Sequence, residues 1–470
     1  MQDDLQEDIK GSYRDSVATI SAEGSRNFIY PKKPKGKLYN LRTLFSVFYL
    51  IIFFTLPFIK VHDEPIFMFN VLERKFIFFG VVFWPQDFFI FGIGMLTFIV
   101  FVILFTVVCG RIFCGWACPQ TIFMEMVFRK IEFWIDGNSH QQKILKEKSW
   151  TSEKIFKRSL KFIIFFLISF IIANFFLAYL ISMDKLIGYI EFPAEHTGTL
   201  ISLLIFTTIF FFVYWWFREQ VCIVVCPYGR LQGVLLDKDS IVVAYDHVRG
   251  EQRTKLKDAE HNANAGDCID CFACVKVCPT AIDIRNGTQL ECINCTACID
   301  ACDDIMEQVK KSKGLIRYAS ENSITNNVKL KFNNRIKAYT VVLSLLLIFL
   351  CFLIVTRTDL DVRLMRTSGM SFTTMPNGSI SNLYNLKLVN KTHQDISYEL
   401  RLNNLPGEIK FVGSNSTIVK KEDYSNIQFF VILNKALVKS WKTTITICLY
   451  QNGKKLKIVD ANFIGPEIYN

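Results

Sequence analysis

Histidine is scarce in this chain: there are six among 470 residues, and none lies in a long apolar run. A haem b held between membrane helices needs axial histidines on those helices, so we expect no such haem. The chain also lacks a G-x-G-x-x-G turn after a strand and a Walker phosphate loop. The chain therefore has neither of the common motifs for binding a dinucleotide or a nucleotide. Electrons are therefore expected to come from a partner or a quinol.

The first 40 residues lack the apolar core of a signal peptide, so we expect no cleavage there. Five later segments are apolar over about 18 residues or more, the length at which a helix crosses a bilayer roughly 30 Å thick. These segments are 41–59, 88–108, 162–181, 200–217 and 338–355. The sequence therefore predicts a multi-pass α-helical membrane protein with about five spans.

Lysine and arginine are distributed unevenly over the connecting loops. The 110–161 segment carries ten of them, whereas 60–87 carries three and 182–199 carries one. By the positive-inside rule, the N-terminus, 110–161 and 218–337 are predicted to be cytoplasmic, and the chain after residue 355 periplasmic. The net charge of +11 is explained by these inner loops and their contact with anionic lipid, so we expect no nucleic-acid partner.

Cysteine is frequent, with 15 residues. By the predicted topology, twelve lie in four groups on the cytoplasmic side. Cys109 and Cys351 lie in spans, and Cys448 is the one cysteine outside. A single outside cysteine cannot form a disulfide within its domain, and a reducing compartment favours metal ligation for the other twelve.

The densest cysteines form two runs with the spacing C-x-x-C-x-x-C-x-x-x-C. This spacing is typical of bacterial two-cluster ferredoxins, in which the fourth cysteine of each run ligates the other cluster. The predicted ligands of one [4Fe-4S] cluster are Cys268, Cys271, Cys274 and Cys302, and those of the other are Cys292, Cys295, Cys298 and Cys278. Structural zinc is the alternative, but paired C-x-x-C groups would leave the four-cysteine repeat unexplained. Cys302 is followed by Asp303 where these ferredoxins have proline, which alters local packing without removing a ligand.

Two more cysteine pairs follow the second and fourth spans, each in a C-x-x-x-C-P motif preceded by an arginine. Cysteines at positions i and i+4 share one helix face, with Cβ atoms roughly 6 Å apart. Both spans run in the same direction, so the pairs should emerge at similar depth and can converge as four soft ligands for Cu(I), zinc or an iron–sulfur centre. The alternative is that they are small packing residues. These candidate catalytic and copper-binding residues are Cys114, Cys118, Cys222 and Cys226.

After residue 355 the pattern changes to short segments rich in β-branched and aromatic residues. "QNGKK" supplies an Asn-Gly hairpin turn between two of them. We expect an immunoglobulin-like all-β sandwich, and we find no catalytic constellation in it. The expected organisation is a cytoplasmic tail (1–40), a four-span membrane domain (41–237), an inserted α+β two-cluster ferredoxin domain (238–320), a linker (321–337), a fifth span (338–355) and the immunoglobulin-like domain (356–470).

Several stretches together resemble the CcoG/FixG/RdxA family of cytochrome c oxidase accessory proteins. They are "GRIFCGWACPQT", "CPYGRLQ", the double ferredoxin run, "CDDIM" and "GLIRYASEN", followed by a span and an immunoglobulin-like tail. The resemblance covers nearly the whole chain after residue 35. It implies a bacterial inner-membrane iron–sulfur protein that works with cbb-type oxidase assembly factors and copper-handling proteins. It also implies reduction of Cu(II) to Cu(I), with the C-x-x-x-C-P cysteines as the copper-site candidates.

Three functions remain open from the sequence. The first is an oxidoreductase of the cupric reductase type that serves oxidase assembly. The second is a quinol dehydrogenase relay to another respiratory partner, which predicts cluster reduction by quinol without copper dependence. The third is a non-redox assembly scaffold, which would tolerate loss of the clusters and is disfavoured by eight spaced thiolates. The electron donor is not identified by the sequence.

Overall fold

The structure is a computed structural model. It describes residues 19, 26–61, 64–71, 75–84, 87–259, 264–326, 334–358, 360–367, 372–376, 378–392, 394–413, 417–421, 423–438, 440–451 and 453–466. The chain forms two compact units: residues 1–59 with 93–348, and residues 60–92 with 349–470. Three of the six histidines, His62, His261 and His393, lie outside the described residues.

Five helices in the described residues are long and apolar enough to cross a membrane, which confirms the fold class. They are α2 (Lys37–Thr55, continued by η2, Leu56–Phe58), α3 (Phe88–Cys109), α8 (Ser152–Ile181), α10 (Thr197–Phe212, continued by η5, Val213–Phe217) and α17 (Asn334–Val355). The largest difference from the sequence prediction is α8, which begins ten residues earlier than 162. Its first turns are polar, and the Thr151 side chain caps them by accepting a hydrogen bond from the Lys154 N–H.

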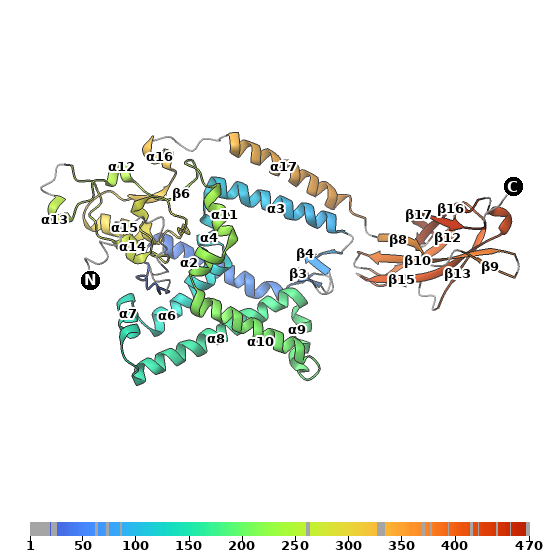
Figure 1. The fold of residues 1–470 in the computed structure, drawn as a ribbon, viewed down its shortest axis with the longest axis horizontal. Helices are drawn as coiled ribbons and strands as arrows, with labels where there is room; N and C mark the ends of the chain where they lie inside the picture. The colour runs from blue at the N-terminus through green and yellow to red at the C-terminus, as the bar shows by residue number, and fades with distance from the viewer. Residues whose placement is uncertain are drawn as a thin grey trace. The chain divides into compact units, whose positions relative to one another are not determined.

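Shorter helices connect the spans of the first unit. They are α4 (Ile112–Trp116), α5 (Pro119–Thr121), the π-helix η4 (Ile122–Phe128), α6 (Arg129–Ile135), α7 (Ser139–Glu147), α9 (Met183–Glu191), the π-helix η6 (Val221–Val225) and α11 (Pro227–Leu235). Figure 1 shows α8 and α10 side by side, and the two helices are in contact. Aromatic side chains fill the space beside them. Phe128 stacks on Tyr214 with ring centroids 4.5 Å apart, so the segment after the first C-x-x-x-C-P motif is packed into the helix bundle.

The ferredoxin segment of the first unit is built on a two-stranded antiparallel sheet of β6 (Val242–Tyr245) and β7 (Ile316–Ala319). Its helices are α12 (His247–Gly250), α13 (Leu256–Ala259), α14 (Ala273–Val277), η7 (Ile284–Asn286), α15 (Ala297–Gln308) and α16 (Glu321–Thr325). The Asp300 carboxylate on α15 accepts hydrogen bonds from the backbone N–H groups of Leu38 and Tyr39 at the start of α2. Gly36 allows the start of α2 to lie close to α15, because a Cβ at residue 36 would lie 2.2 Å from Asp300 Cγ. The ferredoxin segment is thus attached to the first membrane helix.

The second unit contains the predicted all-β domain. One sheet has the order β13-β15-β10-β8 with β9 beside β10, and the others are β12-β16-β17 and β11-β14. The strands are β8 (Leu360–Arg366), β9 (Thr373–Thr374), β10 (Ile380–Asn390), β11 (Ile396–Ser397), β12 (Glu399–Leu402), β13 (Gly407–Phe411), β14 (Ile418–Val419), β15 (Tyr424–Leu433), β16 (Lys442–Gln451) and β17 (Lys454–Ile464), with η8 at Lys435–Leu437. The side chains of Tyr384, Phe429, Ile447 and Phe463 are fully buried between the sheets. The β16–β17 hairpin forms as predicted, although Asn452 of its turn lies outside the described residues.

The loop after the first span differs from the expected organisation, because residues 60–92 belong to the second unit and not to a continuous 41–237 domain. Its strands are β1 (Lys60–Val61), β2 (Glu64–Pro65), β3 (Phe67–Asn70), β4 (Lys75–Phe78) and β5 (Val81–Phe83). Buried Asp87 pairs with Arg357 at 2.8 Å and with Lys391 at 2.5 Å. Hydropathy alone does not reveal this tertiary pairing.

Asp87→Asn is expected to loosen the 60–92 segment from the all-β domain. The change leaves two cations with little solvent contact and no counter-charge, which costs about 3–5 kcal/mol. Hydrogen exchange should therefore become faster in β3–β5. Glu399→Gln is the control, because its ion pair with Arg401 is exposed and should matter by at most about 1 kcal/mol. Equal exchange rates in β3–β5 for Asp87→Asn and the unmodified chain would contradict the role given to Asp87.

Candidate iron–sulfur and thiol sites

The first ferredoxin pocket is lined by Cys268, Cys271, Cys274 and Cys302. Three of these thiols come from the first run around α14, and the fourth comes from α15. Apolar side chains complete the wall, among them Met306, Leu315 and Ile316. Four thiols around one apolar pocket are a donor set that suits an iron–sulfur cluster.

The second pocket is lined by Cys278, Cys292, Cys295 and Cys298. Each run thus contributes three thiols to one pocket and its last thiol to the other. Cys274 borders the second pocket as well as the first, so the two pockets are immediate neighbours. Cys278 leaves α14 in an extended conformation because Pro279 follows it, and this turns its side chain away from its own run.

The four thiols of the second ferredoxin pocket are too buried to ionise readily without a metal. Burial, followed by the neighbouring Cys295 and Cys292, raises the pKa of the Cys298 thiol well above its ordinary value. Burial also raises the pKa of Cys292 to about 12. Iron binding must therefore displace protons, and the positive charge of the metal supplies the driving force.

The two C-x-x-x-C-P motifs share one local geometry. Cys118 and Cys226 are extended, with φ −65° and ψ 125° for the first and φ −69° and ψ 111° for the second. The proline that follows each cysteine disfavours helical geometry at the cysteine and then occupies the first turn of the next helix. π-Helices flank both motifs: η4 follows the first, and η5 and η6 precede the second proline. The repeat seen in the sequence is therefore also a structural repeat.

The thiols of the two motifs are close enough to influence one another. Burial and then Cys118, with smaller contributions from Cys114 and Cys226, raises the pKa of Cys222 to about 12. Burial raises the pKa of Cys114 to about 11, with Arg111 opposing the shift. The Cys114 Sγ also donates to Oε1 of Gln232, at 3.0 Å. Within the described residues, no three His, Cys, Asp or Glu side chains are close enough to hold one metal ion.

The first C-x-x-x-C-P motif touches the second ferredoxin pocket. Cys114 packs against the apolar cluster that contains Ile293 and Cys295, with Cys298 beside it. Gly115 is needed at this contact, because a Cβ there would lie 2.4 Å from the Ile293 carbonyl oxygen. Trp116 Nε1 donates to the Tyr318 hydroxyl at 3.1 Å, and that hydroxyl donates to the Asn294 carbonyl at 3.2 Å. The sequence did not predict this contact, because it joins residues about 180 positions apart.

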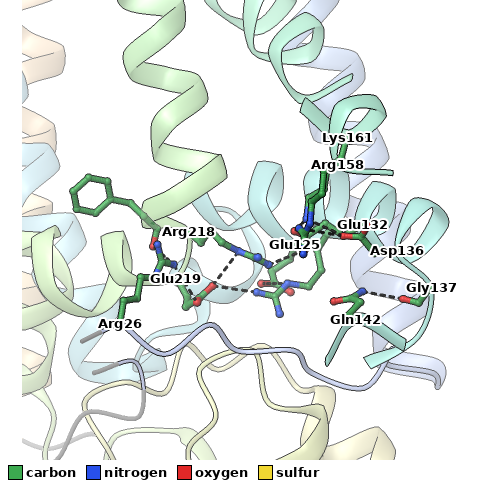
Figure 2. Close-up of polar contacts among 12 residues, drawn as sticks. Arg26, Glu125, Glu132, Asp136, Gly137, Gln142, Arg158, Lys161, Arg218 and Glu219 are labelled. Atoms are coloured by element: carbon green, nitrogen blue, oxygen red, sulfur yellow. Dashed lines mark hydrogen bonds and ion pairs between the residues drawn. The ribbon is translucent and has the colours of Figure 1, made fainter. Parts of the chain in front are cut away.

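A buried ion-pair network lies next to the motifs and was missed by the sequence analysis (Figure 2). Glu132 pairs with Arg218 at 2.6 Å and with Lys161 at 2.6 Å, and Glu219 pairs with Arg129 at 3.3 Å. Burial alone would raise the pKa of Glu132, but Arg218, Lys161 and Arg129 together lower it to about 2. The sequence feature that could have revealed this network is the charged pair Arg218–Glu219, directly after an apolar run. The network joins the segment after the first motif to the residues just before the second, and so fixes the relative position of the two motifs.

The other cysteines lie apart from these groups. Cys109 is half-buried at the end of α3, Cys351 is exposed on α17, and Cys448 is buried in the all-β core. Asp303 has a structural contact: its carboxylate accepts a hydrogen bond from the Gly314 N–H at 2.8 Å. This bond closes the loop after α15 and leaves Cys302 directed into the first pocket.

Comparison with known families accounts for most of the chain. A 4Fe-4S dicluster domain matches residues 217–321, a 4Fe-4S binding domain matches residues 91–138, and an IG-like fold at the C-terminus of FixG matches residues 350–466. Protein RdxB of Cereibacter sphaeroides is 31% identical over 86% of this chain and 90% of the relative. The chain belongs to the FixG family. Protein RdxA of the same organism is 32% identical over 81% of this chain and 83% of the relative.

The nitrogen fixation protein FixG of Rhizobium meliloti is 31% identical over 83% of this chain and 82% of the relative. These matches confirm the family resemblance drawn from the cysteine motifs and the domain order. This FixG-family chain is accordingly a membrane iron–sulfur protein with 4Fe-4S domains and a C-terminal immunoglobulin-like domain.

Proposed function

We propose that this chain is a membrane-bound electron-transfer protein that reduces Cu(II) to Cu(I) for the copper site of a cbb-type cytochrome c oxidase. The observation that carries the proposal is the contact of Cys114 with the wall of the second ferredoxin pocket. This contact places a soft-metal motif beside an iron–sulfur site in one compact unit. The family resemblance supplies the oxidase, its assembly factors and copper-handling proteins as the proposed partners.

The eight ferredoxin cysteines are the proposed cluster ligands. Cys268, Cys271, Cys274 and Cys302 hold one [4Fe-4S] cluster, and Cys278, Cys292, Cys295 and Cys298 hold the other. When bound, each cluster supplies a one-electron carrier. The buried wall of the second pocket shields its thiolates from water, and the shared border at Cys274 keeps the transfer distance short.

The proposed copper ligands are Cys114, Cys118, Cys222 and Cys226, which must move closer together than they lie in this structure to hold one ion. Soft thiolates favour Cu(I) over Cu(II), so copper held there is easier to reduce. Binding releases the thiol protons, since burial keeps Cys114 and Cys222 protonated in the metal-free protein. Cu(II) would then accept one electron and become Cu(I), and a reduced cluster held by Cys278, Cys292, Cys295 and Cys298 would supply that electron. Gln232, which accepts from Cys114, orients that thiol.

Purified protein is expected to contain about eight irons per chain, because two cubanes carry four irons each. It should also show a broad visible absorption that dithionite bleaches. Serine at Cys268 or at Cys292 should lower the iron content and the bleachable absorption, whereas serine at Cys351, which lies on a lipid-facing helix, should change neither. Zinc in place of iron in metal analysis would contradict the ligand assignment.

Copper reduction is tested directly with the full chain in lipid nanodiscs. The protein is reduced with dithionite under argon, excess reductant is removed, and Cu(II) is added with a Cu(I)-specific chelator. We expect the absorption of the oxidised clusters to return as Cu(I) appears, with one Cu(I) for each electron released. If a soluble quinol reduces the oxidised clusters and Cu(II) does not reoxidise them, the quinol dehydrogenase function is the correct one.

We also propose that the ferredoxin segment faces the cytoplasm and the all-β domain faces the periplasm. The lysine and arginine bias of the 110–161 loop supports this orientation. Protease added to intact spheroplasts should remove residues 357–470 and spare 218–337. Digestion of the ferredoxin segment under those conditions would reverse the assigned orientation.

A further inference from the structure

Two arginines from the membrane part of the first unit flank the second ferredoxin pocket. Arg42 lies near the start of α2, and Arg111 lies in the loop after α3; each is only 3% exposed. Arg42 donates through Nε to the Gly115 carbonyl oxygen at 2.7 Å and lines a cavity together with Cys295. Arg111 donates to the Cys292 carbonyl oxygen at 3.3 Å.

Neither arginine has a carboxylate partner in the described part of the chain. The other partners of Arg111 are the Leu290 and Gly229 carbonyl oxygens and the Gln232 amide, which are all neutral. Nη2 of Arg42 is buried and has no hydrogen-bond partner. Glu125 lines the cavity of Arg42 and Cys295, but it is paired with Arg129 at 3.1 Å.

Buried charges in proteins are normally paired, because an isolated buried ion is strongly destabilising. Two guanidinium groups without a carboxylate partner lie beside one pocket lined by thiols. We therefore expect that pocket to hold a negative charge. A [4Fe-4S] cluster with four thiolate ligands carries a net negative charge and supplies it. The arginines are thus complementary to the occupied state of the pocket.

The first pocket is different, because its cations are already neutralised. Arg285 lines that pocket and pairs with Asp270 at 2.6 Å and with Asp283 at 2.7 Å. Nearby Arg249 pairs with Asp267 at 2.5 Å. The two pockets therefore have the same number of proposed cluster ligands and a different balance of buried charge.

We propose that Arg42 and Arg111 are the counter-charges of the second cluster and set its reduction potential above that of the first. Reduction adds one negative charge to a cluster, and unpaired cations in a poorly solvated site stabilise that charge. Electrons would then pass from the first cluster to the second, whose pocket wall packs against Cys114. The inference rests on the cluster ligands proposed above and is independent of whether copper is the final acceptor.

The test is a redox titration followed by electron paramagnetic resonance on the full chain in nanodiscs. Arg42→Gln should shift one midpoint potential downward and leave the other unchanged, with iron content intact. The shifted signal should be the one that survives in Cys268→Ser, which disrupts the first cluster. Arg42→Lys keeps the charge and should largely restore the potential. Arg158→Gln is the control, since Arg158 lies next to Asp136 and outside the pocket walls.

Unchanged potentials in Arg42→Gln, an upward shift, or equal shifts of both signals would overturn the inference. If Arg42→Gln loses iron, Arg111→Gln is the second neutral variant, and it is judged by the same rule. If both neutral variants lose iron while Arg42→Lys retains it, the counter-charge role is supported and the claim about potential is overturned. A downward shift of the second cluster together with failed copper reduction would leave this inference standing and refute the proposed function alone.

Discussion

Serine at both Cys114 and Cys118 is expected to lower the rate of cupric reduction by at least about 100-fold, because even changes around a metal's ligands cost about 10–100-fold. Two of the four proposed soft ligands are lost, so Cu(I) is no longer favoured at the site. Iron content should stay at the unmodified level, since neither thiol lines a ferredoxin pocket. The measurement is Cu(I) formation by dithionite-reduced protein, with metal analysis of the same sample.

Cys109→Ser is the matched control for this variant. Cys109 lies at the end of α3, only five residues before Cys114, but outside the motif. It should bind and reduce copper at the normal rate. Cys292→Ser should give the complementary result, with copper still bound but reduced slowly. Normal copper binding and reduction in the Cys114/Cys118 variant would show that these thiols pack the helix ends or serve another acceptor.

Glu132→Gln is expected to lower the apparent melting temperature of the full chain in nanodiscs by on the order of 10 °C. The substitution removes the carboxylate that Arg218 and Lys161 share and leaves them only Glu219 and Asp136, which costs about 3 kcal/mol. Because this network joins the segment after the first C-x-x-x-C-P motif to the residues just before the second, copper reduction should fall together with stability. Thermal unfolding followed by intrinsic fluorescence measures the first effect.

The same carboxylate predicts a dependence of stability on pH. Neighbouring cations, working against burial, lower the pKa of Glu132 from 4.5 to about 2. Its contribution of about 3 kcal/mol is therefore complete above the unfolded value near 4.5 and is lost as the pH falls toward 2. Glu132→Gln should remove this part of the acid sensitivity.

Glu153→Gln is the control for both effects. Glu153 also pairs with two lysines, at 2.8 and 3.1 Å, but its side chain is 55% exposed, so its pairs should contribute little. Equal melting temperatures for Glu132→Gln and Glu153→Gln at neutral pH would show that the buried network does not stabilise the unit.

The sequence by itself determined the parts of this protein that depend on local pattern. Apolar runs of sufficient length identify the five spans, because a helix is the only local structure that satisfies its backbone in lipid. The cysteine spacing separates the ferredoxin runs from the C-x-x-x-C-P pairs, since cluster ligation needs thiols at short, fixed intervals. Alternating strands and an Asn-Gly turn identified the all-β domain and its last hairpin.

Only the tertiary structure decided which of these parts touch. The contact between Cys114 and the second pocket, the pairing of Glu132 with Arg218, and the attachment of the 60–92 loop through Asp87 all join residues far apart in the chain. The sequence around a buried charged residue does not identify its partner, because the pairing depends on which elements pack together. For the same reason, Arg42 and Arg111 read as ordinary basic residues in the sequence, and the fold alone shows that they face the second pocket unpaired.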